Sequence, residues 1–382
     1  MKTPGQCSSR VFSGSTTNLA IALFLLTTCA LLPFGHTTSE AQQQKQRRNS
    51  PFSEWDKNGD GFLVLDEFPN RLGKRLFARI DANNDGRISK KEDDAFRARN
   101  QNRQNAQPSL PAGSKVDRNI IYETIGKRKL PLDLYRPATS QPVPLVIWVH
   151  GGGWKSGTKN GAGPALALLE RGYAVASVEY RLSGEAIFPA AIEDCKAAVS
   201  FLRLNANKYQ LDPHRFGVWG SSAGGHLVAL LGTTNDVNDF DTHPVTKKSS
   251  SAVQAICNWF GPTDFLRMDD FLGKIHHDGP DSPESRFIGG PIQDRAKQVQ
   301  KANPISYVTA NDPPFLILHG ENDQLVPFQQ SQLLHDALQK AGVQSELYRV
   351  KNGDHGFKGA TESREKLVER SMNFFDSLLK AD

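Results

Sequence analysis

Short apolar runs alternate with amphipathic stretches along the chain from about residue 115 to its end. The run at 143–150, VPLVIWVH, is continuously apolar and leads into glycines, which is typical of a strand buried on both faces. Residues 188–209 instead repeat apolar side chains at helical spacing. Strands that alternate with helices predict a mostly parallel sheet covered by helices on both faces. Ligands of such sheets bind beyond the carboxyl ends of the strands.

The same pattern predicts the other elements of this region. Further strands are expected at 119–126, 130–137, 172–181 and 215–219, within 252–264 and 313–327, and at 345–350. Further helices are expected at 223–231, 329–342 and 364–380.

The N-terminus has a different pattern. Lys2 and Arg10 precede an apolar run at 19–34, and small and polar residues follow it. This order predicts a secretory signal peptide at 1–41, cleaved after Ala41, and therefore export to the periplasm or the extracellular space. The alternative is a membrane anchor, but the run is short for a span of about 20 residues. No later segment is long and apolar enough, so no stable membrane span is expected after cleavage.

Composition narrows the class of protein. The chain has 382 residues, of which 38% are hydrophobic and 23% charged, so it can bury a sizeable core. The net charge of +5 is small and its basic residues are scattered, so no nucleic-acid partner is expected. Only Cys195 and Cys257 remain after signal cleavage, and both are expected to be buried thiols.

Two segments upstream share one pattern of acidic residues. Residues 56–67 and 81–92 both match D-x-[DN]-x-[DN]-G-x5-E at every defined position. Positions 1, 3, 5 and 12 of such a loop give calcium side-chain oxygens, position 7 gives a carbonyl, and glycine at position 6 permits a sharp turn. The expected ligands are Asp56, Asn58, Asp60, the Phe62 carbonyl and Glu67 in the first loop, and Asp81, Asn83, Asp85, the Arg87 carbonyl and Glu92 in the second.

These loops predict a small all-α EF-hand pair at 51–99, between polar linkers at 42–50 and 100–114. The loops start 25 residues apart, and this close spacing resembles the short EF-hand repeats of secreted bacterial proteins. The unit contains no methionine that would line a target-binding groove. A structural calcium module of modest affinity, which stabilises its own fold or mediates attachment, is therefore expected rather than a sensor.

A candidate nucleophile lies in the sequence GSSAG at 220–224. The motif G-x-S-x-G follows a predicted strand and opens a predicted helix, which is the context of a nucleophile elbow. Its central residue is Ser222, and the neighbouring Ser221 is expected to be structural. Glycines at the flanking positions tolerate the strained backbone and let a substrate approach.

The strand at 143–150 leads into HGGGW, which resembles the HGGG oxyanion motif of lipases and esterases. Backbone N–H groups can stabilise the negative charge that attack on an ester carbonyl places on oxygen. The resemblance implies N–H donors at Gly152 and Gly153, and at Ala223, the residue after the nucleophile.

An acid and a base follow in the order Ser, Asp, His that is typical of α/β-hydrolases. Asp323 lies in a loop after a predicted strand, and His355 lies in a loop before the last helix. The imidazole would take the serine proton while the aspartate fixes its tautomer. Asp264 also follows a strand and remains an alternative acid, whereas His226 and His319 are expected to be structural.

Residues 115–382 resemble an α/β-hydrolase esterase of the hormone-sensitive-lipase-like and feruloyl/acetylxylan-esterase-like group. The segments VHGGGW, VEYRL, FPAAIEDCKAAVSFLR, GSSAGGHLV, HGENDQLVP and GDHGF carry this resemblance. Only about 30 residues precede the HGGG strand, which leaves no room for a large N-terminal helical cap and favours the compact carbohydrate-esterase type. Residues 265–303 lack a clear period and are expected to form a lid.

The sequence therefore predicts an exported serine hydrolase that cleaves carboxylic esters through an acyl-enzyme on Ser222. The resemblance implies short-acyl or aromatic-acyl esters of small or polymeric carbohydrates as substrates, and no cofactor for catalysis. A lipase, an amidase or a peptidase of the same fold remain alternatives. A calcium-dependent binding protein with an inactive hydrolase domain is the alternative from a different class.

Overall fold

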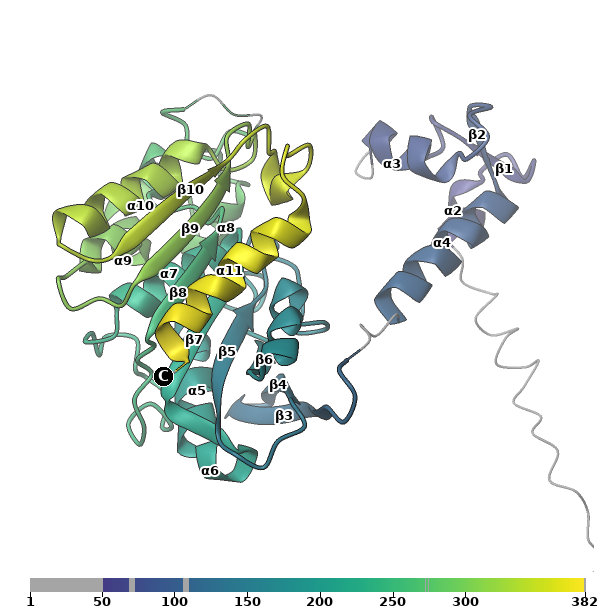
Figure 1. Ribbon diagram of the computed structural model, residues 1–382. Coiled ribbons are helices and arrows are strands. Elements are labelled where there is room, and N and C mark those ends of the chain that lie inside the picture. The colour runs from purple at the N-terminus through teal and green to yellow at the C-terminus, as the bar shows by residue number, and fades with distance from the viewer. Residues whose placement is uncertain (1–50, 69–72, 106–109, 272, 274, 381–382) are drawn as a thin grey trace, which may run out of the picture. The chain divides into compact units, whose positions relative to one another are not determined.

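The computed structural model describes residues 51–68, 73–105, 110–271, 273 and 275–380 (Figure 1). The expected signal peptide and the first linker lie outside these residues. The chain divides between Ala106 and Gln107 into two compact units.

The larger unit is built on one eight-stranded sheet with the order β10-β9-β8-β7-β5-β6-β4-β3. Strands β5 to β10 run parallel, β4 pairs antiparallel with β6, and β3 pairs antiparallel with β4. The strands are β3 (Lys115–Ile125), β4 (Arg128–Arg136), β5 (Val143–Val149), β6 (Ala174–Val178), β7 (Leu211–Ser221), β8 (Ala255–Trp259), β9 (Phe315–Gly320) and β10 (Ser345–Val350). The predicted mostly parallel sheet is confirmed.

Helices cover both faces of this sheet, because alternate residues of its strands enter two different cores. Ile147 of β5 belongs to a core with α5 (Ala190–Leu204), α7 (Ala223–Thr233) and α10 (Phe328–Lys340). Its neighbour Trp148 belongs to a second core with α11 (Arg364–Leu379) and the 3₁₀ helix η2 (Gly163–Arg171). In Figure 1, α11 crosses one face of the sheet. Burial on both faces explains why the β5 sequence is continuously apolar.

Shorter helices complete the unit. They are η2 (Gly163–Arg171), α6 (Ala206–Tyr209), η3 (Phe265–Arg267), α8 (Pro283–Ile288), η4 (Ile292–Arg295), α9 (Ala296–Ala302), η5 (Pro304–Tyr307) and η6 (His355–Phe357), beside the long C-terminal α11 (Arg364–Leu379). The helix predicted at 188–209 is thus divided into α5 and α6 at Asn205. Four of the short helices lie within 265–303, which explains the absence of one period there.

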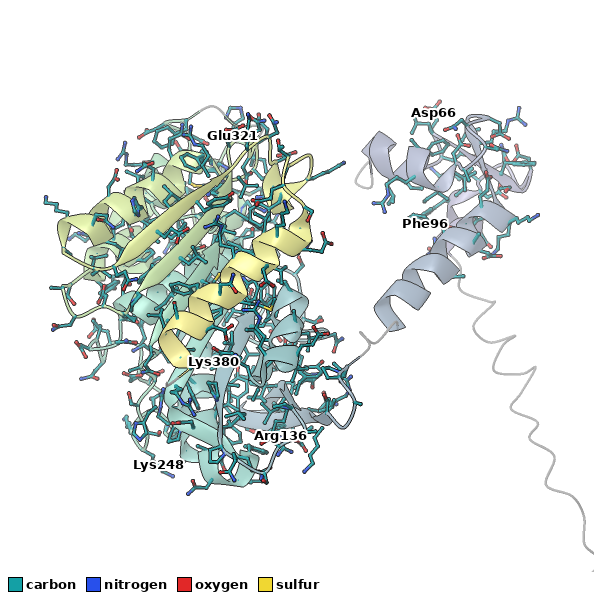
Figure 2. The ribbon with its side chains drawn as sticks, in the orientation of Figure 1. Asp66, Phe96, Arg136, Lys248, Glu321 and Lys380 are labelled. Carbon is teal, nitrogen blue, oxygen red and sulfur yellow. The ribbon has the colours of Figure 1, made fainter. Side chains whose placement is uncertain are left out.

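The smaller unit contains α2 (Pro51–Trp55), α3 (Gly73–Ile80) and α4 (Lys90–Asn105). It also contains two short antiparallel strands, β1 (Phe62–Val64) and β2 (Arg87–Ser89), so it is not purely helical as predicted. Leu63 of β1 pairs with Ile88 of β2, and both lie in a small apolar core. Phe96 of α4, labelled in Figure 2, packs against this core.

Helix α4 continues to Asn105, beyond the expected boundary of the EF-hand pair at residue 99. The first residues of the expected second linker are therefore helical. Residues 100–105 are Asn, Gln and Arg without glycine or proline, and the first proline comes only at 108. Gln and Arg are good helix formers, so a polar composition here did not mean a break in the helix.

Two expectations concern single features of the described residues. Cys195 and Cys257 are free thiols and both are buried, as the sequence predicted. Within the described ranges, none of the helices is both long enough and apolar enough to cross a bilayer.

Candidate active site

Ser222 occupies a sharp turn between β7 and α7. Its backbone has φ 55° and ψ −123°, a conformation that is uncommon and strained for a residue with a side chain. The flanking glycines are required by close packing. A Cβ at Gly224 would lie 2.1 Å from the Val149 carbonyl oxygen, and one at Gly220 would lie 2.3 Å from the Gly224 oxygen. The motif therefore places the serine at the carboxyl end of a central parallel strand.

Ser222, His355 and Asp323 contact one another in series. Ser222 Oγ lies 3.1 Å from His355 Nε2, and His355 Nδ1 lies 2.7 Å from Asp323 Oδ2. In the sequence, Ser222 is 133 positions from His355, and Asp323 is 32 positions from it. With a proton on Nδ1 shared with the carboxylate, Nε2 is free to accept the serine proton. This is the geometry required of a nucleophile, its base and the group that orients the base.

The Asp323 carboxylate is buried and surrounded by donors. The backbone N–H groups of Leu325 and Val326 each donate to Oδ1 at 2.9 Å. Burial alone would raise the pKa of Asp323, but hydrogen bonds from His319 and His355 outweigh burial and hold the pKa well below its usual value. Asp323 is therefore an ionised carboxylate at neutral pH.

The competing residues lie elsewhere in the hydrogen-bond network. Asp264 caps η3 by accepting from Leu266 N at 3.2 Å, and burial raises its pKa. Asp354 accepts from the backbone N–H of His355 at 2.8 Å, so its side chain fixes the loop rather than the imidazole ring. Ser221 is the last residue of β7, where it pairs with Trp259. His355 contacts neither Asp264 nor Ser221 through its ring nitrogens.

The glycine loop after β5 lies against the serine turn. A Cβ at Gly151 would lie 3.2 Å from Ser222 Cβ, and one at Gly152 would lie 2.2 Å from the Ser156 carbonyl oxygen. Gly152 and Gly153 have φ values of 117° and 59°, which favour glycine. Outside the helices and strands of the described residues, no backbone hydrogen bond uses the N–H of Gly152, Gly153 or Ala223. These three donors are thus available to an oxyanion.

Tyr180 holds this loop and was not singled out as a functional residue in the sequence. Its hydroxyl donates to the His150 carbonyl at 2.9 Å, and its ring stacks on the His150 ring at 4.3 Å between centroids. Burial lowers the pKa of His150, so the imidazole is neutral, and its Nδ1 lies 2.8 Å from the Gly151 carbonyl. The motif VEYRL carried the signal, but only the sheet order shows that Tyr180 follows the strand next to β5.

A cavity of about 510 Å³ opens above the serine turn. Its walls combine the catalytic candidates with residues of the segment 265–303 and of the Asp323 loop. They include Gly151–Ser156, Ser221–Ala223, Phe260, Pro262, Ile275, His277, Pro283, Glu284, Leu325, Val326 and His355. The expected lid segment therefore contributes directly to the wall of the candidate active site.

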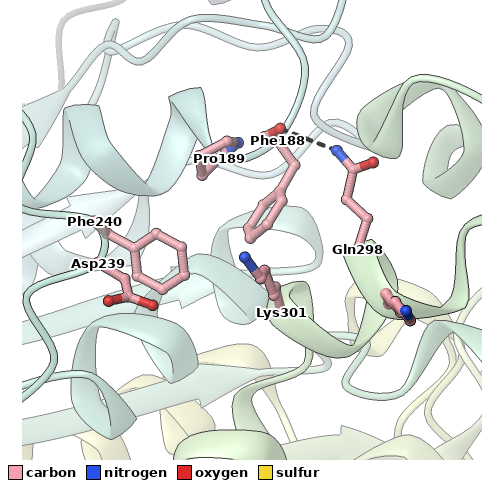
Figure 3. Close-up of a pocket in the computed structure, with 7 residues that line it drawn as sticks. Phe188, Pro189, Asp239, Phe240, Gln298 and Lys301 are labelled. Atoms are coloured by element: carbon pink, nitrogen blue, oxygen red, sulfur yellow. Dashed lines mark hydrogen bonds between the residues drawn. The ribbon is translucent and has the colours of Figure 1, made fainter.

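A second, larger hollow lies elsewhere in the same unit (Figure 3). It measures about 630 Å³ and is lined by Phe188, Pro189, Asp239, Phe240, Lys297, Gln298 and Lys301. The Gln298 amide donates to the Phe188 carbonyl at 3.4 Å, the bond drawn in Figure 3. None of its lining residues pairs a nucleophile with a base, so it is not the site of the serine chemistry.

Each acidic loop of the smaller unit is closed by its own carboxylates. In the first loop, Asp56 accepts from the N–H groups of Gly59 at 2.8 Å and Gly61 at 3.0 Å, and Glu67 accepts from Val64 N at 3.2 Å. Gly61, the sixth position, has φ 83°, as the sharp turn requires. Asn58 and Asp60 are linked by a side-chain hydrogen bond of 3.2 Å.

The second loop repeats this arrangement. Asp81 accepts from Gly86 N at 3.0 Å, and Glu92 accepts from Ala82 N at 3.0 Å and from Ser89 N at 2.8 Å. Hydrogen bonds from the Ser89 backbone and side chain lower the pKa of Glu92. Asn83 and Asp85 are joined at 2.9 Å, as their counterparts are in the first loop.

The candidate metal ligands of both loops are oxygen atoms, which are the ligands that calcium prefers. Within the part of the chain that the structure describes, however, no three Asp, Glu, His or Cys side chains already cluster as metal ligands. The carboxylates instead accept hydrogen bonds from their own loops. Each carboxylate has about four lone-pair sites, so these hydrogen bonds leave oxygen lone pairs that could ligate a cation.

The fold and the serine–histidine–aspartate contacts together define an α/β-hydrolase. A family model, BD-FAE, matches residues 132–338, and an EF-hand model matches residues 74–92. The chain belongs to the BD-FAE family, and the predicted resemblance to esterases is confirmed.

Proteins similar to this chain include named esterases. Esterase LipQ of Mycobacterium tuberculosis is 32% identical over 267 residues, which cover 67% of this chain and 61% of LipQ. The chain thus spans about three-fifths of this curated relative. The structure entitled a truncated form of carbohydrate esterase from gut microbiota is 31% identical, with a TM-score of 0.62, and covers 71% of this chain and 98% of that one. A bifunctional GH43-CE protein of Bacteroides eggerthii is 35% identical, with a TM-score of 0.59. The match covers 69% of this chain and 38% of that one.

Proposed function

We propose that this protein is an exported serine esterase that hydrolyses carbohydrate esters of short or aromatic acids through an acyl-enzyme on Ser222. The observation that carries this proposal is the series of contacts from Ser222 Oγ through His355 to Asp323, at the wall of one cavity. A binding scaffold has no need for that alignment beside a loop of free backbone donors.

The first half of the reaction forms the acyl-enzyme. Ser222 Oγ attacks the ester carbonyl carbon while its proton passes to His355 Nε2. The carbonyl oxygen becomes an oxyanion, which the N–H groups of Gly152, Gly153 and Ala223 stabilise without reorganising. The bond to the alcohol then breaks, and the proton on Nε2 goes to the departing alkoxide oxygen. Asp323 stabilises the imidazolium that exists between these transfers.

The second half regenerates the serine. A water molecule replaces the alcohol, gives a proton to His355 Nε2 and attacks the acyl carbonyl. The same backbone donors stabilise the second oxyanion. When the tetrahedral intermediate collapses, the proton returns to Ser222 Oγ and the carboxylic acid leaves. No step requires a metal or an organic cofactor.

The substrate class is supported by the similarity to a carbohydrate esterase from gut microbiota and by the modest size of the cavity. A panel of acetylated xylosides, feruloyl sugar esters, triglycerides and acyl amides tests it. The proposal requires the highest kcat/KM among the sugar esters. Preference for triglycerides would indicate a lipase, preference for amides an amidase or peptidase, and no turnover of any ester a binding protein.

We also propose that the two acidic loops bind calcium in a structural role. The two sequence matches, the family match at 74–92 and the oxygen-only donor sets support this. Export through residues 1–41 rests on the sequence pattern alone. Expression of the full chain in a bacterial host tests it: N-terminal sequencing of the exported protein should begin at Gln42, and retention of the intact N-terminus in the cell contradicts it.

A further inference from the structure

A second pair of titratable side chains lies in the wall of the cavity that contains Ser222. His277 Nδ1 and Glu284 Oε2 are 3.0 Å apart, and each side chain is only 4% exposed. Both residues line the cavity, and the mechanism above uses neither of them. Neither residue was predicted, because segment 265–303 has no regular spacing of apolar residues and no known motif.

Helix α8 fixes the position of Glu284 relative to the HGGG loop. Ser282 caps α8 by accepting from Ser285 N at 3.0 Å, which places Glu284 in the first turn of that helix. The preceding Pro283 lies against Gly153, where an added Cβ would meet the proline Cβ at 3.3 Å. The Glu284 carboxylate is therefore carried by a helix that packs directly on a candidate oxyanion donor.

Further along α8, Phe287 stacks on Trp154 of the HGGGW loop, with ring centroids 4.6 Å apart and an angle of 18° between the planes. On the other side, Asp269 fixes the His277 loop by accepting from the N–H groups of His277 at 2.9 Å and Asp278 at 3.0 Å. These contacts hold both members of the pair on rigid neighbours.

The cavity wall that contains the pair also has the apolar side chains of Phe260, Pro262, Ile275, Leu325 and Val326, beside polar ones such as Lys155 and Ser156. Burying an ion pair among such residues is costly unless its remaining donors and acceptors are satisfied. Here they are not. Beyond their mutual contact of 3.0 Å and the neighbouring Leu325 backbone, His277 Nδ1 and Nε2 and Glu284 Oε2 have no hydrogen bond of good geometry within the described residues. The pair thus keeps hydrogen-bonding capacity that its own contact does not use.

The environment of His277 favours its protonated form. Burial would lower the pKa of His277, but the Glu284 carboxylate beside it, with Asp269 further away, raises that pKa above its usual value. An imidazolium that donates and a carboxylate that accepts match a hydroxyl group, which can accept from one and donate to the other. An apolar group at this place would leave both charges unsolvated.

We propose that His277 and Glu284 form a hydroxyl-binding subsite that selects substrates whose alcohol part carries a free hydroxyl next to the ester. The substrate hydroxyl donates to Glu284 and accepts from His277 while Ser222 attacks the neighbouring acyl group. This inference rests on the proposed esterase function and deepens it, because adjacent hydroxyl groups are the general feature of partly acylated sugars.

Two small esters of equal size test the subsite directly. Ethylene glycol monoacetate carries a hydroxyl where propyl acetate carries a methyl group. A hydrogen bond to a charged group contributes about 1.5–3 kcal/mol, so the parent enzyme should prefer the glycol ester by about 10- to 150-fold in kcat/KM. Glu284→Gln should reduce this ratio at least about tenfold, and Glu170→Gln, on an exposed surface, should leave the ratio as in the parent.

Three outcomes would overturn the inference. The first is a kcat/KM ratio of the glycol ester to propyl acetate near one in the parent enzyme. The second is an equal loss of kcat/KM for both esters in Glu284→Gln, which would indicate a purely structural role. Alternatively, Glu284→Gln changes the preference for ethyl glycolate over ethyl propionate instead, which places the hydroxyl on the acyl side. If Glu284→Gln does not fold, His277→Gln is measured with the same esters.

The carbohydrate assignment is tested separately with acetylated xylosides. Failure to cleave them, together with a Glu284-dependent preference for the glycol ester, rejects the carbohydrate substrate and retains the hydroxyl subsite. Rapid cleavage of xylosides with no such preference rejects the subsite and retains the proposed function.

Discussion

His319 Nε2 lies 3.3 Å from Asp323 Oδ2, the same carboxylate oxygen that His355 Nδ1 contacts at 2.7 Å. His319 is fully buried, and its other ring nitrogen lies 2.6 Å from Ser331 Oγ. The acid of the site is therefore fixed from behind by a histidine that does not reach the cavity.

Asp323→Asn should lower kcat by about 10⁴-fold, because an amide at this position favours the wrong tautomer of His355. His319→Gln should cost far less, about tenfold or about 1.4 kcal/mol, because His319 Nε2 lies closer to the Val326 carbonyl, at 2.9 Å, than to Asp323. Steady-state hydrolysis of p-nitrophenyl acetate measures both. Asp264→Asn is the matched control, and a severe loss there with a mild loss for Asp323→Asn would move the acid to Asp264.

The adjacent serines provide a second test. Ser222→Ala should reduce turnover of p-nitrophenyl acetate by on the order of 10⁶-fold, as expected when a nucleophile is removed. Ser221→Ala should retain substantial activity, because His355 contacts only the second serine. Mass spectrometry after a fluorophosphonate probe should find the label on Ser222. Label on Ser221, or the reverse pattern of activity, contradicts the assignment.

The fold should become less stable in acid because His226 is buried in its neutral form. Its Nε2 donates to the Ala302 carbonyl at 2.7 Å, and burial lowers its pKa to about 4. The unfolded chain protonates histidine near pH 6.5, so it binds more protons than the folded state between those values. The free energy of unfolding contributed by this group therefore falls as pH drops from about 6.5 to about 4.

Thermal unfolding from pH 7.5 to 4.5 measures this contribution. His226→Gln keeps a donor for Ala302 but cannot titrate, so its midpoint should fall less steeply with acidification than that of the parent. His214→Gln changes an exposed histidine and should follow the parent curve. Parallel curves for the parent and His226→Gln would contradict the prediction.

Calcium should bind the smaller unit without affecting hydrolysis. Titration calorimetry of the full chain should show binding that Glu67→Gln and Glu92→Gln each weaken, since each removes a bidentate carboxylate. A loss of about 1.4 kcal/mol in the free energy of calcium binding corresponds to a tenfold rise in the Kd for calcium. Glu54→Gln, an exposed residue of α2 outside the loops, is the control.

Two results would contradict this picture. Absence of any calcium heat in the parent removes the metal assignment. Loss of p-nitrophenyl acetate hydrolysis in chelator, without unfolding, shows a coupling between the loops and the esterase that the proposed mechanism does not contain.

Local patterns predicted the elements and the nucleophile because both are local properties. The G-x-S-x-G sequence and its strand–turn–helix context lie within about twenty residues. The choice between Asp264 and Asp323 was different, since both follow a strand in the sequence. Only the packing of β8 beside β9 and the loop after β10 shows which carboxylate meets His355.

The His277–Glu284 pair was beyond sequence reasoning for a related reason. Neither residue belongs to a motif, and the contact depends on how the loop that carries His277 packs beside helix α8. The end of α4 was misjudged for a local reason: polar side chains were interpreted as a linker, although Gln and Arg support a helix. Composition alone does not distinguish these two states.

The glycine contacts between the HGGG loop and the serine turn have a consequence for how this protein can change. Gly151, Gly220 and Gly224 have no space for even one extra carbon. Substitutions that redirect activity are therefore not expected at these three glycines. The cavity wall contributed by 265–303 contains side chains such as Ile275 and Pro283, so laboratory evolution of this chain for new esters should accumulate its productive changes there and leave the glycines untouched.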